Sequence, residues 1–222
     1  MDTPSKALTK PLIQRFYRIT KTVYQLLHDR GYLIFEEDLT MSLKKFKKSF
    51  KSIEEHIIYS SHENDPDNTI LVIFDHNDYN PDLVKKVPLL KLGEMTDMCA
   101  RHNQYHESST TIKKKIIITN RKLATNASKY LNSPSGQDIE VFYEQELLIN
   151  ITDHTLVGIF KLLSAQEKVE MLKKYKITEQ ELPRIEKEDN ISRYFGARQG
   201  DVFKVIRKSD IAGRYLYYRI VQ

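Results

Sequence analysis

The sequence is nearly free of cysteine, since Cys99 is the only one among 222 residues. A single cysteine excludes an intramolecular disulfide and a cysteine-rich zinc site, and it favours a reducing compartment. Long apolar runs are also missing: no stretch reaches the roughly 18 apolar residues of a membrane span, so we expect none. No apolar core follows residues 1–6, so we expect no signal peptide.

Motifs for common enzyme chemistry are missing as well. The seven glycines include no GxGxxG or GxxxxGK spacing, which argues against the nucleotide-driven enzymes that use these loops. GxSxG and HExxH are absent too. Cys99 and His102 would share one face of a helix, with His106 beyond, but no third group is present to orient them. We therefore expect no catalytic residue, no metal site, no cofactor and no small-molecule substrate.

One enzyme class remains as a disfavoured alternative. Pro81-Asp82 in an α/β domain is compatible with a PD-(D/E)xK nuclease, in which carboxylates hold a divalent metal and a lysine positions the attacking water. No Asp or Glu in this chain is followed by Lys two places later, so the signature is incomplete.

Ordinary core material is abundant, with 40% hydrophobic residues, 13 Tyr and 9 Phe, which predicts a folded chain. Apolar residues recur every three or four positions over 12–30, which predicts a helix that ends at Gly31. A second helix is expected over 39–50, with Asp38 near its cap.

The middle of the chain indicates an α/β layer. Ile- and Val-rich runs at 69–74, 115–119 and 139–143 predict buried strands, and a helix is expected over 121–131. Strand, helix, strand in this order favours a parallel crossover. The polar segment 60–68 is expected to be a loop.

The last third has a different pattern. Leu147, Ile149 and Ile151 alternate as in a strand. Capping boxes begin at Ser164 and at Thr178, and the first predicts a helix with Val169, Leu172 and Tyr175 facing inward. A short helix is expected to end at Gly196, and segments 202–207 and 215–221 predict an antiparallel hairpin. We place a domain boundary near Glu144.

Basic residues gather in two places, in a chain of net charge +5. Lys44, Lys47, Lys48 and Lys51 would share one helical face, which fits non-specific contacts with DNA phosphates, although the solvated outer face of an amphipathic helix gives the same pattern. Arg121 and Lys122 follow a predicted strand and lie where loops at a sheet edge often bind ligands.

Several motifs in the C-terminal third occur in order over about 75 residues and resemble the fifth subunit shared by eukaryotic nuclear RNA polymerases. The C-terminal domain of that family is similar to a small archaeal RNA polymerase subunit that consists of this domain alone. These motifs are Gln145 to His154, Gln180 to Ile185 with its Leu-Pro-Arg-Ile turn, Asp189 with Ser192 to Gly196, Val205 to Arg207, Ala212 to Tyr215, and Tyr218 to Val221. The N-terminal match is carried by Leu26 to Leu33.

The sequence departs from the family pattern in two places. Thr125 to Lys129 takes the position of a Thr-Pro-Ser-Ala-Lys loop but lacks its proline. Val157 to Phe160 replaces a Val-Pro and a His. These departures do not affect the family resemblance, but they leave undecided which contacts these two loops make.

The resemblance implies α/β and α+β architecture: a restriction-endonuclease-like jaw domain over 1–144, then a small mixed α/β assembly domain with a C-terminal β-hairpin over 145–222. It implies a non-catalytic polymerase subunit that docks on the largest subunit, contacts other core subunits and lies beside downstream duplex DNA. Arg184, Arg193 and Arg214 offer forked hydrogen bonds, either to a partner or within the domain. The expected partner-binding residues are Pro183, Arg184, Arg193, Tyr194, Gly196, Gly213, Arg214 and Tyr215, and the expected DNA-contacting residues are Lys44, Lys47, Lys48, Arg121, Lys122, Thr125, Ser128 and Lys129.

A free-standing DNA-binding transcription regulator is the main alternative. The expected location is the nucleus, or a cytoplasmic viral factory and the virion if a large DNA virus encodes the chain.

Overall fold

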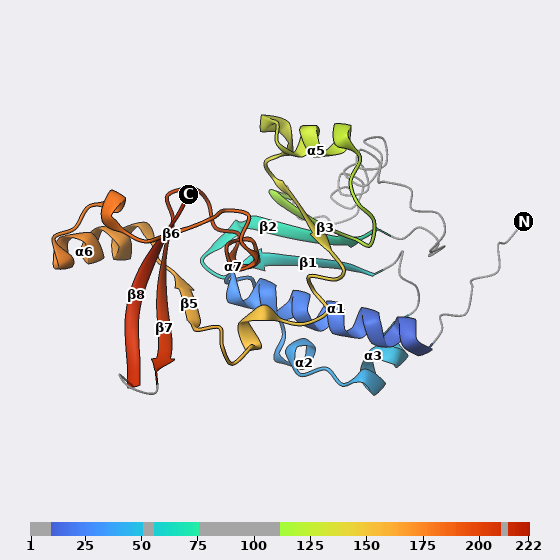
Figure 1. Ribbon diagram of the computed structural model, residues 1–222. Coiled ribbons are helices and arrows are strands. Elements are labelled where there is room, and N and C mark those ends of the chain that lie inside the picture. Colours follow the sequence, from blue (N-terminus) through green and yellow to red (C-terminus); the bar gives the residue numbers. More distant parts are fainter. Residues whose placement is uncertain (1–9, 51–55, 76–111, 210–212) are drawn as a thin grey trace, which may run out of the picture. The chain divides into compact units, whose positions relative to one another are not determined.

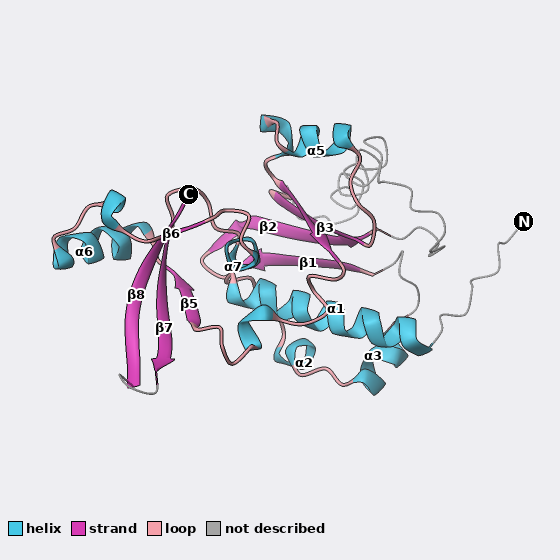
Figure 2. Ribbon diagram, viewed as in Figure 1, coloured by secondary structure: helices cyan, strands magenta, loops and turns pink. Residues whose placement is uncertain are grey.

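The computed structural model describes residues 10–50, 56–75, 112–209 and 213–222. The chain forms two compact units, Met1–Ile149 and Asn150–Gln222 (Figure 1). Each unit contains a four-stranded sheet with helices (Figure 2), which confirms a mixed α/β architecture. No helix within the described ranges is long and apolar enough to cross a membrane.

The sheet of the first unit has the order β1-β2-β3-β4, with β1 at Ile57–His62, β2 at Asp65–Phe74, β3 at Lys114–Thr119 and β4 at Ile139–Tyr143. β1 pairs with β2 antiparallel, whereas β2–β3 and β3–β4 are parallel. The parallel pairs agree with the buried Ile- and Val-rich runs, because such strands are covered on both faces.

Helices α1 (Lys10–Asp29) and α5 (Thr125–Leu131) lie on opposite sides of this sheet (Figure 1). On one face, Phe16 of α1 meets Phe74 of β2 at a ring distance of 6.2 Å. On the other, Ala127 of α5 packs with Ile117 and Ile139. The predicted helices over 12–30 and 121–131 are confirmed, although α5 begins four residues later than expected.

Gly31 follows α1 with φ +85°. A side chain there would be strained, and its Cβ would lie 2.9 Å from Nε2 of His62. The glycine stop predicted for this helix is therefore confirmed.

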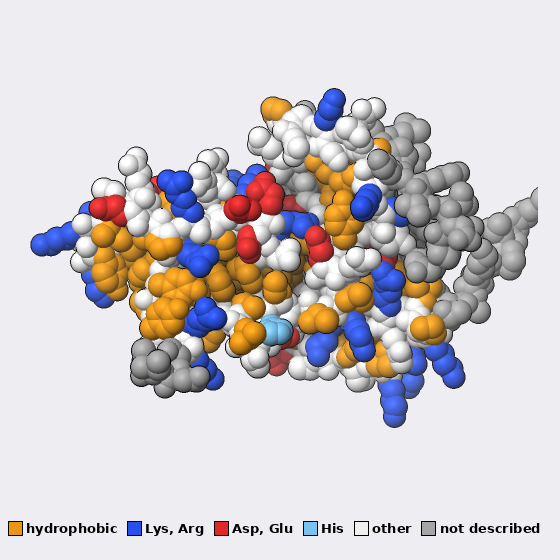
Figure 3. All heavy atoms as spheres, viewed as in Figure 1, with side chains coloured by type: hydrophobic (Ala, Val, Ile, Leu, Met, Phe, Trp, Pro, Cys, Tyr) orange, Lys and Arg blue, Asp and Glu red, His pale blue; other side chains and the backbone are white. Residues whose placement is uncertain are grey.

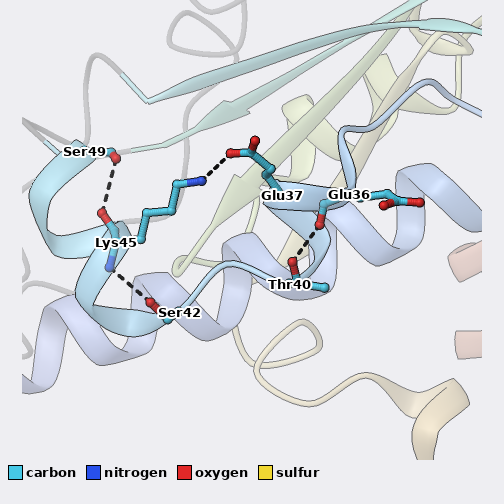
Figure 4. Close-up of polar contacts among 6 residues, drawn as sticks. All are labelled: Glu36, Glu37, Thr40, Ser42, Lys45 and Ser49. Atoms are coloured by element: carbon cyan, nitrogen blue, oxygen red, sulfur yellow. Dashed lines mark hydrogen bonds and ion pairs between the residues drawn. The ribbon is translucent and has the colours of Figure 1, made fainter.

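The single helix expected over 39–50 is wrong. Two short helices stand there instead, α2 (Glu36–Leu39) and α3 (Leu43–Ser49). Ser42 interrupts the pattern because its Oγ accepts a hydrogen bond from the Lys45 backbone N–H at 3.3 Å, as an N-cap does (Figure 4). The Thr40 hydroxyl donates to the Glu36 carbonyl at 2.8 Å and so closes the end of α2.

The loop expected over 60–68 is also wrong, because most of these residues lie in the paired ends of β1 and β2, which form a β-hairpin. Its polar residues are tolerated in the sheet because they have partners. Buried Ser60, for example, donates its hydroxyl to the Leu33 carbonyl at 2.7 Å. Periodicity alone misses such a strand since its polar side chains hide the apolar alternation.

The sheet of the second unit has the order β5-β7-β8-β6, with β5 at Ile159–Leu162, β6 at Arg184–Ile185, β7 at Val202–Ser209 and β8 at Gly213–Val221. β7 and β8 form the predicted antiparallel hairpin. The helices are α6 (Ala165–Tyr175) and α7 (Asn190–Phe195), and short 3-10 turns occur at Ile151–Asp153, η2, and Glu179–Glu181, η3.

The two faces of this second sheet pack against different elements. One face contributes Phe203, Val205 and Val221 to a core that includes Ile191 of α7. The other face contributes Val202 to a smaller core that includes Met171 of α6. The inward face expected for α6 is confirmed for Leu172, which packs against this smaller core, but it is wrong for Val169 and Tyr175, which are about half exposed. Both capping boxes and the left-handed Gly196 cap are confirmed.

The strand expected through Leu147, Ile149 and Ile151 is wrong. Turns lead instead into η2, which Asn150 caps by accepting from the Thr152 backbone N–H at 3.0 Å. The apolar alternation has another origin: Leu147 is buried in the first unit, whereas Ile149 is 75% exposed.

Candidate nucleic-acid and assembly surfaces

Two buried carboxylates stand where parallel strands of the first unit end. Asp75 directly follows β2 and Glu144 directly follows β4. Asp75 Oδ2 accepts from the Thr119 hydroxyl at 2.8 Å and from an Arg121 guanidinium N–H at 2.9 Å. Glu144 Oε2 lies 2.8 Å from Nε of Arg15 on α1. The parallel topology brings these groups to one edge, because carboxyl ends of parallel strands meet there.

Burial raises the pKa of the Glu144 carboxyl, the nearby Arg15 opposes that rise, and the Asp75 charge adds to it. Each acid at this edge has its own arginine. An arginine side chain is part of the chain and always charged, whereas a metal ion can dissociate. The cluster therefore holds α1 and the strand ends together. No group of three or more possible metal ligands occurs within the described residues.

A second pair ties α1 to the sheet. The Arg30 guanidinium, only 4% exposed, donates to both Glu140 oxygens, at 3.1 and 2.7 Å. The sequence alone did not predict a role for these acids and their partners. Their one signal was position, since Asp75 and Glu144 each follow a predicted strand directly.

The lysines expected to contact DNA on α3 lie at the surface. Lys44, Lys47 and Lys48 are all exposed, while Phe46 on the same helix is buried. Lys45 differs from them, because its ammonium pairs with Glu37 of α2 (Figure 4). Lys51 lies outside the described residues.

The residues expected to contact DNA near α5 have different surroundings. Lys122, Thr125 and Lys129 are exposed. Ser128 is half-buried, and its hydroxyl donates to the Ala124 carbonyl at 3.3 Å. Arg121 turns toward Asp75, with its side chain 17% exposed. The structure thus places three of these five side chains where phosphates could reach them directly.

In the second unit, Pro183 and Arg184 are exposed beside the end of β8, and the Pro183 carbonyl accepts from the Ile220 N–H at 2.9 Å. Arg193 is half-buried on α7. Tyr194 is 3% exposed, and its hydroxyl accepts from the Asn150 amide at 3.2 Å. Tyr194 therefore acts inside the unit.

The hairpin tip carries three more of the residues expected to contact a partner. Gly213 has φ +70° and starts β8, and Arg214 and Tyr215 after it are exposed. The Tyr215 ring stacks on Tyr217 at 5.3 Å. Gly196 is distant from this tip in sequence and serves as the C-cap of α7.

Four residues considered for enzyme chemistry lie outside the described residues. They are Asp82 of the nuclease-like motif, Cys99, His102 and His106.

Comparison with known proteins gives a consistent result for both units. The family model of the RNA polymerase Rpb5 N-terminal domain matches residues 10–82, and that of the Rpb5 C-terminal domain matches residues 149–221. The chain is 35% identical over 216 residues to the DNA-directed RNA polymerases I, II, and III subunit RPABC1 of Caenorhabditis briggsae, covering 93% of this chain and 95% of that protein.

Similar values hold for two other relatives with the same name. The subunit of Caenorhabditis elegans is 34% identical over 216 residues, and that of Dictyostelium discoideum is 35% identical over 213 residues, which covers 98% of its length. These matches confirm the resemblance found in the sequence. The chain belongs to the RNA polymerase Rpb5 family.

Proposed function

We propose that the chain is a non-catalytic structural subunit of a multi-subunit DNA-directed RNA polymerase. In this proposal residues 145–222 dock on the largest subunit, and residues 1–144, with a restriction-endonuclease-like core, contact downstream duplex DNA. The observation that carries it is 35% identity, over 93% of the chain, to a protein named as a subunit of RNA polymerases I, II and III. Such a subunit would act in the nucleus, or in a cytoplasmic viral factory if the source is a large DNA virus.

The buried acids support a structural rather than a catalytic role for the first sheet. Asp75 and Glu144 lie at the sheet edge where an α/β nuclease would be expected to place its metal-binding carboxylates. Each of them is instead paired with an arginine of the same unit. A metal ion would have to compete with fixed guanidinium groups. We expect the purified chain to lack metal-dependent DNA cleavage.

High-salt affinity purification of the tagged full chain from its native cell tests the assembly role. We expect the two largest polymerase chains at equal stoichiometry with the tagged protein. A regulator would instead be recovered alone or with substoichiometric partners, which would overturn the assembly role.

The exposed lysines of α3 support DNA contact in the first unit. Replacing Lys44, Lys47 and Lys48 by Glu should weaken binding of the full chain to duplex DNA and make the slope of log affinity against log salt shallower by about 2–3, because each lost phosphate contact removes about 0.9. Replacing Lys173, Lys174 and Lys187, which are exposed in the second unit, is the matched control. Equal weakening by both triple variants would contradict a specific role for α3.

A further inference from the structure

An apolar row crosses three strands of the second unit. Ile159 of β5 lies opposite Ile206 of β7, and Ile206 lies opposite Leu216 of β8. Side chains directly opposite one another in antiparallel strands share a face and touch. Ile159 is 69% exposed and Leu216 is 40% exposed, so this row forms an exposed apolar strip, which we call the Ile159 row.

The Ile159 row lies beyond the cover that α6 provides. The core on this face includes Val202, Ile220 and Met171. Val202 and Ile206 are four residues apart along β7, which separates them by about 13 Å. Among the described residues of this unit, the sheet face is therefore packed at one end and open at the other.

The row ends at an open strand edge, because β5 pairs only with β7 among the strands that the structure describes. The N–H of Leu163 donates to the Val202 carbonyl at 3.0 Å. In an antiparallel ladder, residues alternate between facing the partner strand and facing away from it. The backbone groups of Phe160 and Leu162 thus point away from β7, as a docking strand requires.

Charge on these strands has one sign. β5, β7 and β8 contain six Lys and Arg residues and no Asp or Glu. The register places Lys204, Lys208 and Arg214 on the same face as the Ile159 row. Lys161 also lies on this face but pairs with Glu167 at 2.8 Å. In the space-filling view, hydrophobic side chains gather over this unit with Lys and Arg among them (Figure 3).

We propose that this surface binds an extended segment of a partner polymerase subunit, rich in apolar and acidic side chains, that adds as a fifth strand beside β5 and continues across the uncovered end of this face. Its backbone pairs with the open edge, and the part that crosses the face covers the Ile159 row and brings carboxylates to Lys204, Lys208 and Arg214. Added strands gain affinity from main-chain hydrogen bonds and specificity from alternate side chains. The inference rests on the proposed assembly role and gives that role a surface and a partner chemistry.

Charge insertion tests the surface in the full chain. The double variant Ile159→Glu with Leu216→Glu should lower recovery of the polymerase core through high salt by at least about tenfold, as expected when central apolar contacts are lost. Val169→Glu on α6 is the control, since Val169 is 49% exposed and lies off the row. It should recover the core as the unaltered chain does.

The outcomes separate the two claims. Full recovery by the double variant would overturn this surface and leave the assembly role standing, whereas no recovery by the unaltered chain would overturn both. If the double variant does not fold, Lys204→Glu with Lys208→Glu decides instead, because it keeps the apolar row and should also lose the core.

A photo-cross-linking residue at position 159 identifies the partner segment directly, by mass spectrometry of the cross-linked peptides. We expect cross-linked peptides of a polymerase subunit that contain both apolar and acidic residues. Peptides without acidic residues, or cross-links no stronger than those from position 169, would overturn the proposal.

Discussion

The sheet of the first unit is covered on both faces, by α1 and α5, whereas within the described part of the second unit one face of the sheet is covered only at one end. Charge is also treated differently. The first unit pairs its buried acids with its own arginines, as in Arg121–Asp75 and Arg15–Glu144. In the second unit, β5, β7 and β8 have cations and no acids.

This contrast explains where the two proposed contacts lie. A sheet covered on both faces leaves only helices and loops for contact, and the exposed lysines of the first unit are found there. A sheet with an open edge and an uncovered apolar row can offer its own strands to a partner. The following predictions test whether the units are as separate as their cores suggest.

The largest effect is expected from core truncation. Phe203→Ala should lower the free energy of unfolding of the second unit by about 3–5 kcal/mol, through lost burial and a cavity. Phe203 is fully buried and meets Phe160 and Phe195 at ring distances of 5.8 and 5.7 Å. Hydrogen exchange in urea, resolved by peptide, measures each unit. Phe16→Ala is the matched variant in the first unit, and equal loss of protection in both units by either variant would show one cooperative fold.

Removing the acid of a buried ion pair should come next. Glu140→Ala takes the bidentate partner from Arg30, whose side chain is 4% exposed, and should cost the first unit about 3 kcal/mol. Lys161→Ala breaks the exposed pair with Glu167 in the second unit and should cost below about 1 kcal/mol. Urea titration of both variants gives the comparison, and similar costs would contradict the buried role of Arg30.

Acid should weaken the first unit before the second. Burial lowers the pKa of His56 to about 4, in contact with the Phe50 and Phe74 rings. Between pH 6.5, which is the ordinary pKa of histidine, and about pH 4, His56 binds a proton in the unfolded state but not in the folded state. Stability of the first unit therefore falls as pH falls through this window, by roughly 2–3 kcal/mol.

In the second unit, Glu167 has a strongly lowered pKa. Hydrogen bonds from Lys161 and from the Ser164 backbone lower the pKa of its carboxyl to about 2. Its contribution to stability is present above pH 4.5, the ordinary pKa of a glutamate, and is lost completely only as pH falls through about 2.

Unfolding curves of the His56→Leu variant test the origin of the acid sensitivity. In this variant the stability of the first unit should no longer depend on pH between 6.5 and 4. A first unit that keeps this dependence in the variant would assign it to another group.

The smallest effect is expected at helix caps. Ser164→Ala should cost about 1 kcal/mol, because it removes the hydrogen bond that the Ser164 hydroxyl accepts from the Glu167 N–H at 3.2 Å. That bond also holds Glu167 where its carboxylate accepts from the Ser164 N–H at 2.9 Å. Ser42→Ala removes a single cap contact and should cost about half as much. Thermal unfolding measures both, with Ser164→Asp as a variant that keeps the cap. A larger loss for Ser42→Ala would show that the reciprocal contact adds nothing.

Strong local patterns were predicted correctly from the sequence. The stripe of α1, the Ile- and Val-rich strands β2, β3 and β4, the capping boxes and the C-terminal hairpin each carry their signal within a few residues. The failures occurred where a distant partner changes the meaning of a local pattern. Ser60 lies in a strand because Leu33 satisfies its hydroxyl, and Leu147 is buried outside any strand.

The same division holds for the surfaces. The exposure of Lys44, Lys47 and Lys48 follows from their position opposite Phe46 on a helix, so the sequence alone predicts it. The inward turn of Arg121 follows from Asp75, which is 46 residues away in the chain. The Ile159 row depends on strand register, which joins residues up to 57 positions apart.

The sequence by itself determined the family, the single-cysteine composition and most regular elements, because these depend on residue identity and short-range period. Only the tertiary structure decided that Asp75 and Glu144 are paired internally and that one end of the second sheet is uncovered. Ion pairs and strand registers form between residues that are far apart in the chain, and their energies depend on distances and burial that no local pattern contains.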